Sequence, residues 1–410
     1  MGRCPAGGTF RHVAGRRALF VTPIRPGLVG SGLAHRAAAW QRAIAAVAEL
    51  HTLVVPVADP GAPAAAAAHT TIVALPSEAG HELGAIRGMA LPAVRAAMAA
   101  FDDAPALTAA APPWLGSQAG QHFATAAPFD VVVCFRSYLA PFVAGLRAGS
   151  PALAAARMIV DLDDDDAAYH RSRGATRAAE QYERLVTQIA ATLDPVLVAA
   201  GHHSAPRVGL LPNCVELPTT IADTSPVAGR ALLVANLTYA PNIDAVDWYL
   251  HEVHPLVAAV QPEAHVRLVG RGGERWADHA GVDVAGLVDD LAPEYAAAQV
   301  VIAPVRTGSG TRIKVLEAWA HAKPVVATAA AVDGLVLDVG THALVADAPP
   351  SFADAVLDVL THPDRAAALA AAGRAHVAHR YGSDVFDRAV AELVTGGSMP
   401  GASSGDPAQT

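Results

Sequence analysis

The feature that most constrains the fold is a double run of short apolar segments alternating with longer amphipathic segments. Short runs of Val, Leu and Ile suit buried parallel strands, and the segments between them space their apolar residues as helices do. Such alternation indicates an α/β domain built on a parallel sheet. In the first run we expect strands over 18–24, 53–57, 69–75, 130–135, 158–163 and 195–201, and helices over 33–50, 91–101 and 175–193.

A second run of the same alternation follows a hinge. The segment VGLLPNCVELP carries two prolines and an asparagine, which are typical of a break between elements. After it we expect a helix over 243–260 that Asn242 is placed to cap. We therefore predict an α/β fold of two doubly wound Rossmann-like domains that face each other across a cleft. The other elements expected in this run are strands over 231–236, 265–270, 282–286, 300–305, 323–328 and 343–347, and helices over 291–298, 312–322, 351–360 and 364–380.

The hinge and the chain end divide the sequence into four parts. Residues 1–215 would form an acceptor-side domain and residues 216–380 a nucleotide-binding domain. A terminal helix over 381–395 would return to the N-terminal domain. The small and polar residues of 396–410 predict a disordered tail.

Composition excludes several classes of protein. There is no uninterrupted apolar run of about 18 residues and no signal peptide at the N-terminus, so we expect a cytoplasmic chain. The three cysteines are too far apart for a disulfide framework or a zinc knuckle. A net charge of -9 argues against general affinity for nucleic acid. The first 48 residues hold seven arginines and no acid, which leaves peripheral contact with a membrane open.

Lysine and asparagine are almost absent, and their positions point to one stretch of the chain. The sequence has 27 arginines but only two lysines, and three asparagines, as expected of a GC-rich bacterial genome. A residue type that has been removed elsewhere persists where it is needed. All five survivors lie between residues 213 and 323, and we look for chemistry there: Asn213, Asn236, Asn242, Lys314 and Lys323.

Within that stretch, the segment APVRTGSGTRIKVLEAWAHAKPVVAT predicts a strand, a glycine loop and a helix start. Gly308 and Gly310 let the backbone approach a ligand, and the first helix amides favour an anion. Arg312 and Lys314 fall where the helix dipole disfavours cations by about 0.3 to 1 kcal/mol each, a sign that a bound phosphate would reverse. Glu317 shares the helix face of Lys314. The alternative is a solvated helix start with a Glu–Lys pair.

This segment resembles the donor-site region of retaining glycosyltransferases of the GT-B fold, the group 1 transferases of family 4. The likeness runs from about 230 to 390, through TYAPNIDAVDWYLHEVHPLV, HVRLVGRGG, VDVAGLVDDLAPEYAAAQVVIAPV, VDGL and PDRAAALAAAGRAHVAHRYG. It implies transfer of a sugar, with retention, from a nucleoside diphosphate sugar to a small-molecule or glycan acceptor. Such enzymes serve natural-product, polysaccharide or other glycoconjugate biosynthesis. They use the donor as co-substrate, with no other cofactor and no metal.

The resemblance also implies roles for individual residues. Arg312 and Lys314 would hold the diphosphate and take part in catalysis, and Glu317 would bind the ribose hydroxyls. The sequence departs from the family at Ser309, where many members carry a second glutamate that contacts the donor sugar. The resemblance therefore does not identify which sugar is transferred. The other donor-binding positions are Gly308, Ser309, Gly310 and Thr311 at the phosphate and sugar, Gly30, Ser31 and Gly32 across the cleft, Asn242, and Gly270, Arg271, Gly286, Leu287 and Val288 at the base.

Two further constellations leave alternatives open. The GLVGSG loop, followed by Asp59, could be the dinucleotide-binding motif of an NAD-dependent dehydrogenase. Alternatively, it is a structural turn. Asp161 and Asp163 begin an acidic run that reaches Asp166. The run could place those first two acids against the acceptor or donor sugar, form a solvated loop, or bind a divalent metal. A nucleotide-sugar epimerase or hydrolase of the same fold, and a non-catalytic nucleotide-binding module, also remain open.

Overall fold

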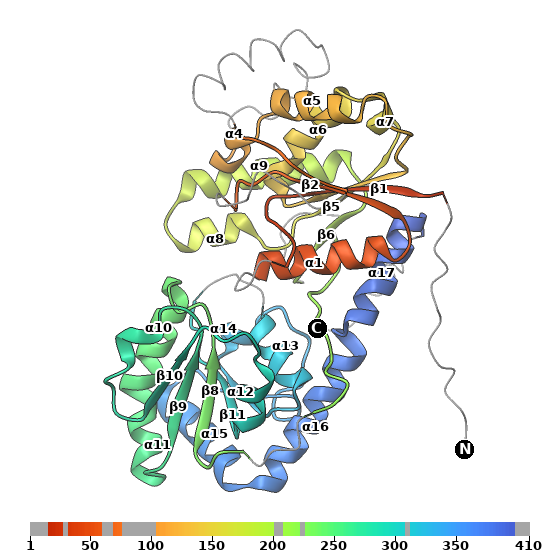
Figure 1. Ribbon diagram of the computed structural model, residues 1–410. Helices are drawn as coiled ribbons and strands as arrows, with labels where there is room; N and C mark the ends of the chain where they lie inside the picture. Colours follow the sequence, from red (N-terminus) through yellow and green to blue (C-terminus); the bar gives the residue numbers. More distant parts are fainter. Residues whose placement is uncertain are drawn as a thin grey trace, which may run out of the picture. The chain divides into compact units, whose positions relative to one another are not determined.

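The chain forms two compact α/β units in a computed structural model (Figure 1). The first unit comprises Met1–Leu211 with Phe386–Thr410, and the second comprises Pro212–Val385. The helix expected over 91–101 and residues 398–410 of the expected tail lie outside the part of the chain that the structure describes. The described residues are 15–27, 32–59, 69–75, 104–200, 208–221, 226–307 and 312–397.

A seven-stranded parallel sheet forms the centre of the first unit. Its strand order is β3-β2-β1-β4-β5-β6-β7. All five residues of the middle strand β4, with sequence VVVCF, are buried, as expected of a strand covered on both faces. The strands are β1 (Arg17–Thr22), β2 (Glu49–Val54), β3 (Thr70–Ile72), β4 (Val131–Phe135), β5 (Arg157–Asp161), β6 (Val196–Val198) and β7 (Val208–Leu210).

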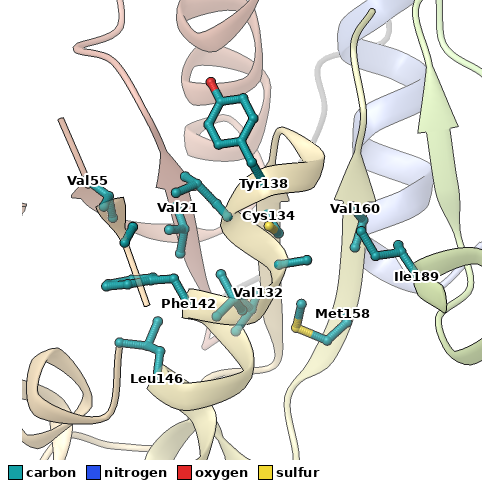
Figure 2. Close-up of a cluster of buried hydrophobic side chains, with 14 of the residues drawn as sticks. Val21, Val55, Val132, Cys134, Tyr138, Phe142, Leu146, Met158, Val160 and Ile189 are labelled. Carbon is teal, nitrogen blue, oxygen red and sulfur yellow. The ribbon is translucent and has the colours of Figure 1, made fainter. Parts of the chain in front are cut away.

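Helices cover both faces of this sheet. Phe142 and Leu146 pack on Val21 and Val132 in the core on one side (Figure 2), whereas α1 and α17 lie on the other side (Figure 1). The helices are α1 (Gly32–Ala45), α4 (Ala106–Ala110), α5 (Pro113–Gly120), α6 (Ala140–Ala148), α7 (Pro151–Ala154), α8 (Asp166–Ser172), α9 (Thr176–Thr192) and α17 (Ser383–Thr395), with 3-10 turns at Gln121–Phe123 and Ser137–Leu139.

The second unit has a six-stranded parallel sheet with the order β10-β9-β8-β11-β12-β13. One face packs on α10, α11 and α15, and the other on α13 and α16. Its strands are β8 (Arg230–Val234), β9 (His265–Val269), β10 (Val282–Gly286), β11 (Val300–Ala303), β12 (Val325–Ala327) and β13 (Leu344–Val345). Its helices are α10 (Ala240–Trp248), α11 (His254–Val260), α12 (Ala292–Ala297), α13 (Ile313–Ala320), α14 (Ala329–Val332), α15 (Pro349–Thr361) and α16 (Pro363–Arg380), with a π turn at Tyr249–Val253 and a 3-10 turn at Gly273–Trp276.

The expected α/β architecture is confirmed, and the differences concern element ends. The helix expected over 243–260 starts earlier, at Ala240, with Pro241 in its first turn. Asn242 therefore lies inside α10 and makes no cap, so the capping prediction is wrong. The expected hinge contains an overlooked strand, β7, whose short sequence has a sheet partner in β6 but little apolar pattern of its own.

The helices α4 and α5 lie in a stretch whose prolines and alanines favoured a loop in the sequence analysis. Tertiary packing stabilises helix formation here although the local sequence favours it only weakly, because glycines bring α5 and α6 into backbone contact. A Cβ atom at Gly145 would lie 1.8 Å from the carbonyl oxygen of Pro113, and one at Gly116 would lie 2.0 Å from that of Phe142. The two helices can approach this closely only with glycine at these positions.

The last helix, α17, carries the chain back to the first unit. Residues from Phe386 onward belong to that unit. The ring of Phe386 packs edge-on against Trp40 of α1, with centroids 5.8 Å apart, and Asp387 pairs with Arg42 at 3.0 Å. In the described residues, no helix is long and apolar enough to cross a membrane.

We predict that Gly145→Ala destabilises the protein by about 1 to 3 kcal/mol, because the added methyl group would overlap the backbone of α5. Gly32→Ala is the matched control, since a Cβ there meets nothing within 4 Å. Chemical denaturation followed by circular dichroism measures both. Equal stabilities of the two variants would contradict the close helix contact.

Candidate functional site

Strand order directs attention to one edge of the second sheet. The chain leaves β8 to build β9 and β10 on one side and then continues at β11 on the other side. Ligands of doubly wound sheets bind at the carboxyl ends of the strands at this kind of reversal. The segments that follow β8 and β11, and the start of α13, therefore form the candidate site.

Lys314 is tied to this edge by two asparagines. Its Nζ donates to Oδ1 of Asn242 at 3.0 Å, and Nδ2 of Asn242 donates to the backbone oxygen of Asn236 at 2.8 Å. The side chain of Asn236 closes its own turn by accepting from the backbone nitrogen of Thr238 at 3.1 Å. Three of the five rare residues thus form one chain of hydrogen bonds. Lys323 lies elsewhere, with its Nζ on the carbonyl oxygens of Ala296 and Ala298 at the end of α12.

Two cations meet at the start of α13. Arg312 immediately precedes the helix and donates to the backbone oxygen of Asp333 at 3.2 Å. Burial and then the positive charge of Arg312 lower the pKa of Lys314 to about 8, against the opposing effect of Glu317. The helix dipole adds to the repulsion. Arg312 also lies 3.8 Å from a carboxylate oxygen of Asp333, whereas the Nζ of Lys314 contacts the neutral amide of Asn242. Two neighbouring cations at a helix start make the site suited to an anion.

Glu317 lies one turn further along α13. Its Oε2 accepts from the hydroxyl of Tyr295 at 3.3 Å. Burial, followed by the nearby Glu317 charge, raises the pKa of Tyr295 well above its usual value, so this hydroxyl stays a donor. Glu317 is held in place, and its helical spacing puts it on the face of α13 that carries Lys314.

The glycine loop itself lies outside the described residues. Gly308, Ser309, Gly310 and Thr311 are therefore not placed. Just before them, Arg306 pairs with Asp244 of α10 at 2.5 Å, and its guanidinium lies 5.7 Å from the ring centre of Trp248. The hydrogen bonds that Arg306 donates to Asp244 raise the pKa of Arg306. This pair could not be predicted from the sequence, because neither residue type is rare or part of a recognisable motif.

The loops expected to meet a base follow β9 and β10 at the same sheet edge. The backbone nitrogen of Gly270 donates to the oxygen of Gly286 at 2.8 Å, and Arg271 accepts from Leu237 at 2.9 Å. Gly270 has φ 133°, and a Cβ there would lie 1.8 Å from the oxygen of Ala235. Leu287 is 54% exposed, and Val288 is half-buried beside it. The structure thus brings these predicted residues together next to the turn of Asn236.

In the first unit, Gly30 and Ser31 lie outside the described residues, and Gly32 is the first residue of α1. Asp59, the acid that a dehydrogenase would use for a ribose, is 6% exposed. It accepts from Nε and Nη2 of Arg25 at 2.5 and 3.3 Å. These hydrogen bonds lower its pKa, so its carboxylate is already occupied by a cation.

Asp161 is fully buried in an ion pair. Its oxygens accept from Nε and Nη2 of Arg36 at 2.7 and 2.9 Å and from Nε1 of Trp40. Arg36 is 1% exposed and also donates to the oxygen of Leu211 at 2.9 Å. A solvated loop is therefore the wrong description of Asp161, and its carboxylate presents no accessible oxygen to a substrate.

Asp163 extends this buried network. It is 3% exposed and accepts from Arg136 at 3.1 Å. Burial raises its pKa to about 6. Asp163 and Arg136 both have positive φ angles, 63° and 80°, which are costly for residues other than glycine. Arg136 also contacts Asp166, and the described residues contain no group of three His, Cys, Asp or Glu side chains arranged to hold a metal ion.

A family model matches part of this chain, and several solved structures resemble most of it. Residues 228–362, about a third of the chain, match the family described as glycosyl transferases group 1. No curated protein matches the sequence.

Solved structures share the whole architecture at low identity. Sucrose-phosphate synthase from Thermosynechococcus elongatus is 16% identical, with a TM-score of 0.67 over 93% of this chain and 98% of its own. WaaG, a glycosyltransferase involved in lipopolysaccharide biosynthesis, is 14% identical, with a TM-score of 0.61 over 93% and 100%. HepE from Anabaena, solved with UDP and glucose, is 14% identical, with a TM-score of 0.60 over 92% and 99%. The chain spans 58% of the length of TarM, to which it is 12% identical with a TM-score of 0.56 over 69% of its own length. The chain therefore has the GT-B fold.

We predict that Asp161→Ala destabilises the protein by about 3 to 5 kcal/mol, because it removes the carboxylate that the buried Arg36 guanidinium contacts at 2.7 Å, while Asp163 lies further away at 3.5 Å. Glu183→Ala breaks the exposed pair with Arg171 and should cost below about 1 kcal/mol. Denaturation midpoints test both variants. An unchanged midpoint with lost activity would instead make Asp161 a residue that contacts substrate.

Proposed function

We propose that this protein is a glycosyltransferase that uses a nucleoside diphosphate sugar and retains the anomeric configuration. The observation that carries the proposal is the pair of cations at the start of α13, at the reversal point of the second sheet. The match of residues 228–362 to glycosyl transferases group 1 supports the reaction class, and the GT-B fold is compatible with it. HepE, with its bound UDP, supports a nucleotide as the donor's leaving group.

In this proposal, the diphosphate lies against Lys314 and Arg312. As the bond from the sugar to the diphosphate breaks, negative charge grows on the departing phosphate oxygens. The ammonium, the guanidinium and the first amides of α13 are already in place to stabilise that charge, so little reorganisation is needed. Removal of a single preorganised oxyanion donor costs other enzymes about 3 kcal/mol of transition-state stabilisation.

Glu317 would accept hydrogen bonds from the ribose hydroxyls, with its carboxylate oriented by Tyr295. The base would lie against the loops at Gly270 and Leu287, where backbone groups and an exposed apolar side chain are available. The acceptor would be bound by the first unit. Since Asp161 and Asp163 are buried in ion pairs, we assign them to the support of that unit's sheet edge, which leaves contact with the substrate to other residues.

Two cations and a helix start already balance a diphosphate, so we propose that no metal is required. A dehydrogenase is the second candidate. It is disfavoured by the occupied carboxylate of Asp59. Wider roles in natural-product, polysaccharide or other glycoconjugate biosynthesis follow from the sequence resemblance and are part of the proposal. The cytoplasmic location expected from composition is part of it as well.

We predict that UDP or GDP raises the melting temperature and that NAD does not. A ligand that binds only the folded protein stabilises it by about 2.7 kcal/mol at a concentration of 100 times Kd. The effect should persist in EDTA. Thermal unfolding with each nucleotide tests this, and stabilisation by NAD alone would favour the dehydrogenase. Stabilisation that is lost in EDTA and restored by magnesium would contradict the metal-free site.

We predict that Lys314→Ala lowers kcat/KM by about 100-fold or more, roughly 3 kcal/mol of transition-state stabilisation. Lys323→Ala is the matched control, because it removes the chain's other lysine, whose partners are carbonyl groups at the end of α12. Donor turnover, followed as nucleoside diphosphate release, measures both. Full activity of the Lys314 variant with a higher melting temperature would show that the cation is merely unfavourable at a helix start.

A further inference from the structure

The contact between Lys314 and Asn242 has a chemistry that only a few residue types could provide. A single side chain bridges an ammonium group, which can only donate, and a backbone carbonyl, which can only accept. The amide of asparagine offers an acceptor and a donor at once. Aspartate could not donate to the carbonyl of Asn236, and alanine could do neither. The orientation of the Asn242 amide is therefore fixed by its two partners.

The charge of the partner matters as much as its geometry. An aspartate beside Lys314 would neutralise the cation and repel a phosphate, whereas the neutral amide leaves the charge in place. An ammonium has three N–H donors. In the described residues, Asn242 accepts the one hydrogen bond of Lys314, which leaves the others for a ligand. The amide thus holds the lysine without competing with the anion.

The anchor of this arrangement joins the start of a helix to the end of a strand. Asn242 lies in the first turn of α10, and its carbonyl partner belongs to the turn that ends β8. That turn is closed by the side chain of Asn236, which accepts from both the backbone nitrogen and the hydroxyl of Thr238, at 3.1 and 2.8 Å. The position of the lysine head group is therefore set by the sheet rather than by its own flexible stem.

We propose that Asn242 is a positioning residue that aims the Lys314 ammonium at the diphosphate of the donor, with the Asn236 turn as its anchor. This inference rests on the proposed function. It gives Asn242, already among the expected donor-binding positions, a defined role from a different helix, and it explains why asparagine persists at 236 and 242 in a chain that has only three.

Protonation of Lys314 supplies a direct measurement. The charged groups that act on it are Arg312, which disfavours the cation, and Glu317, which favours it. From α10 it meets the neutral Asn242, and from α12 the neutral hydroxyl of Tyr295 reaches Glu317. A hydrogen bond to the charged form favours that form, so loss of the Asn242 oxygen should favour the neutral amine, and a carboxylate there should favour the ammonium.

The experiment uses full-length protein grown with lysine labelled with 13C at Cε. Only two lysines exist, so the spectrum has two side-chain signals, which Lys323→Arg assigns. We expect the pKa of Lys314 to fall in Asn242→Ala and to rise in Asn242→Asp, each by about one pH unit or more, with Lys323 unchanged as the internal reference. Asp247→Ala is the matched control, because it removes a side chain of α10 that bonds Trp276 and not the lysine.

The affinity for UDP, GDP and inorganic diphosphate is then measured against pH in the same variants. In the unmodified protein, affinity should fall as the pH rises through the pKa of Lys314. The midpoint should move down in Asn242→Ala and follow the lysine signal, and at pH 7 Asn242→Asp should bind at least about tenfold more weakly because of its added negative charge.

The possible outcomes distinguish failure of the positioning role of Asn242 from failure of the proposed function. Lysine signals that do not respond to either substitution, or that move in the same direction in both, overturn the positioning role even if nucleotides bind well. Lysine signals that respond while none of the three anions binds the unmodified protein overturn the proposed function, and the inference falls with it. Opposite shifts accompanied by the expected changes in affinity support both.

Discussion

Parallel strand pairing is the constraint on which this structure depends. A parallel strand cannot be followed by a tight hairpin, so each return passes through a crossover that covers one face of the sheet. Both faces are then buried, and every strand ends at the same edge. In the second unit this gathers Asn236, Gly270, Gly286 and Arg306 from loops up to about 70 residues apart in sequence. The candidate site is a consequence of this topology.

Buried charge has opposite consequences in the two units. In the first unit, Arg36 and Asp161 compensate each other completely, with further hydrogen bonds from Trp40 and to Leu211. Such a pair adds specificity to the fold, and removal of one member is costly. In the second unit, Lys314 meets a neutral amide and a neighbouring cation, and its pKa falls to about 8. We assign the buried pair of the first unit to support of the fold, and we propose that the neighbouring cations at the start of α13 bind an anionic ligand.

Rare residue types in the sequence pointed to side chains that the structure joins by hydrogen bonds. The persistence of Asn236, Asn242 and Lys314 reflects a network that the chain cannot build from arginine or aspartate. Helix signals were weaker guides around α5, where prolines and glycines obscured a helix that packs closely on α6. The backbone contact at Gly145 is a tertiary requirement and leaves no periodic apolar pattern.

The sequence by itself determined the α/β class, the two alternating runs and the helix that starts beside Arg312, because apolar periodicity is a local property of the chain. Tertiary structure alone decided the partners of the charged groups. Asp161 looked like part of an exposed acidic run and is buried against Arg36, 125 positions away. Asn242 looked like a helix cap and is instead a bridge to Lys314. Hydrogen-bond partners depend on which strands and helices become neighbours, and no local pattern encodes that.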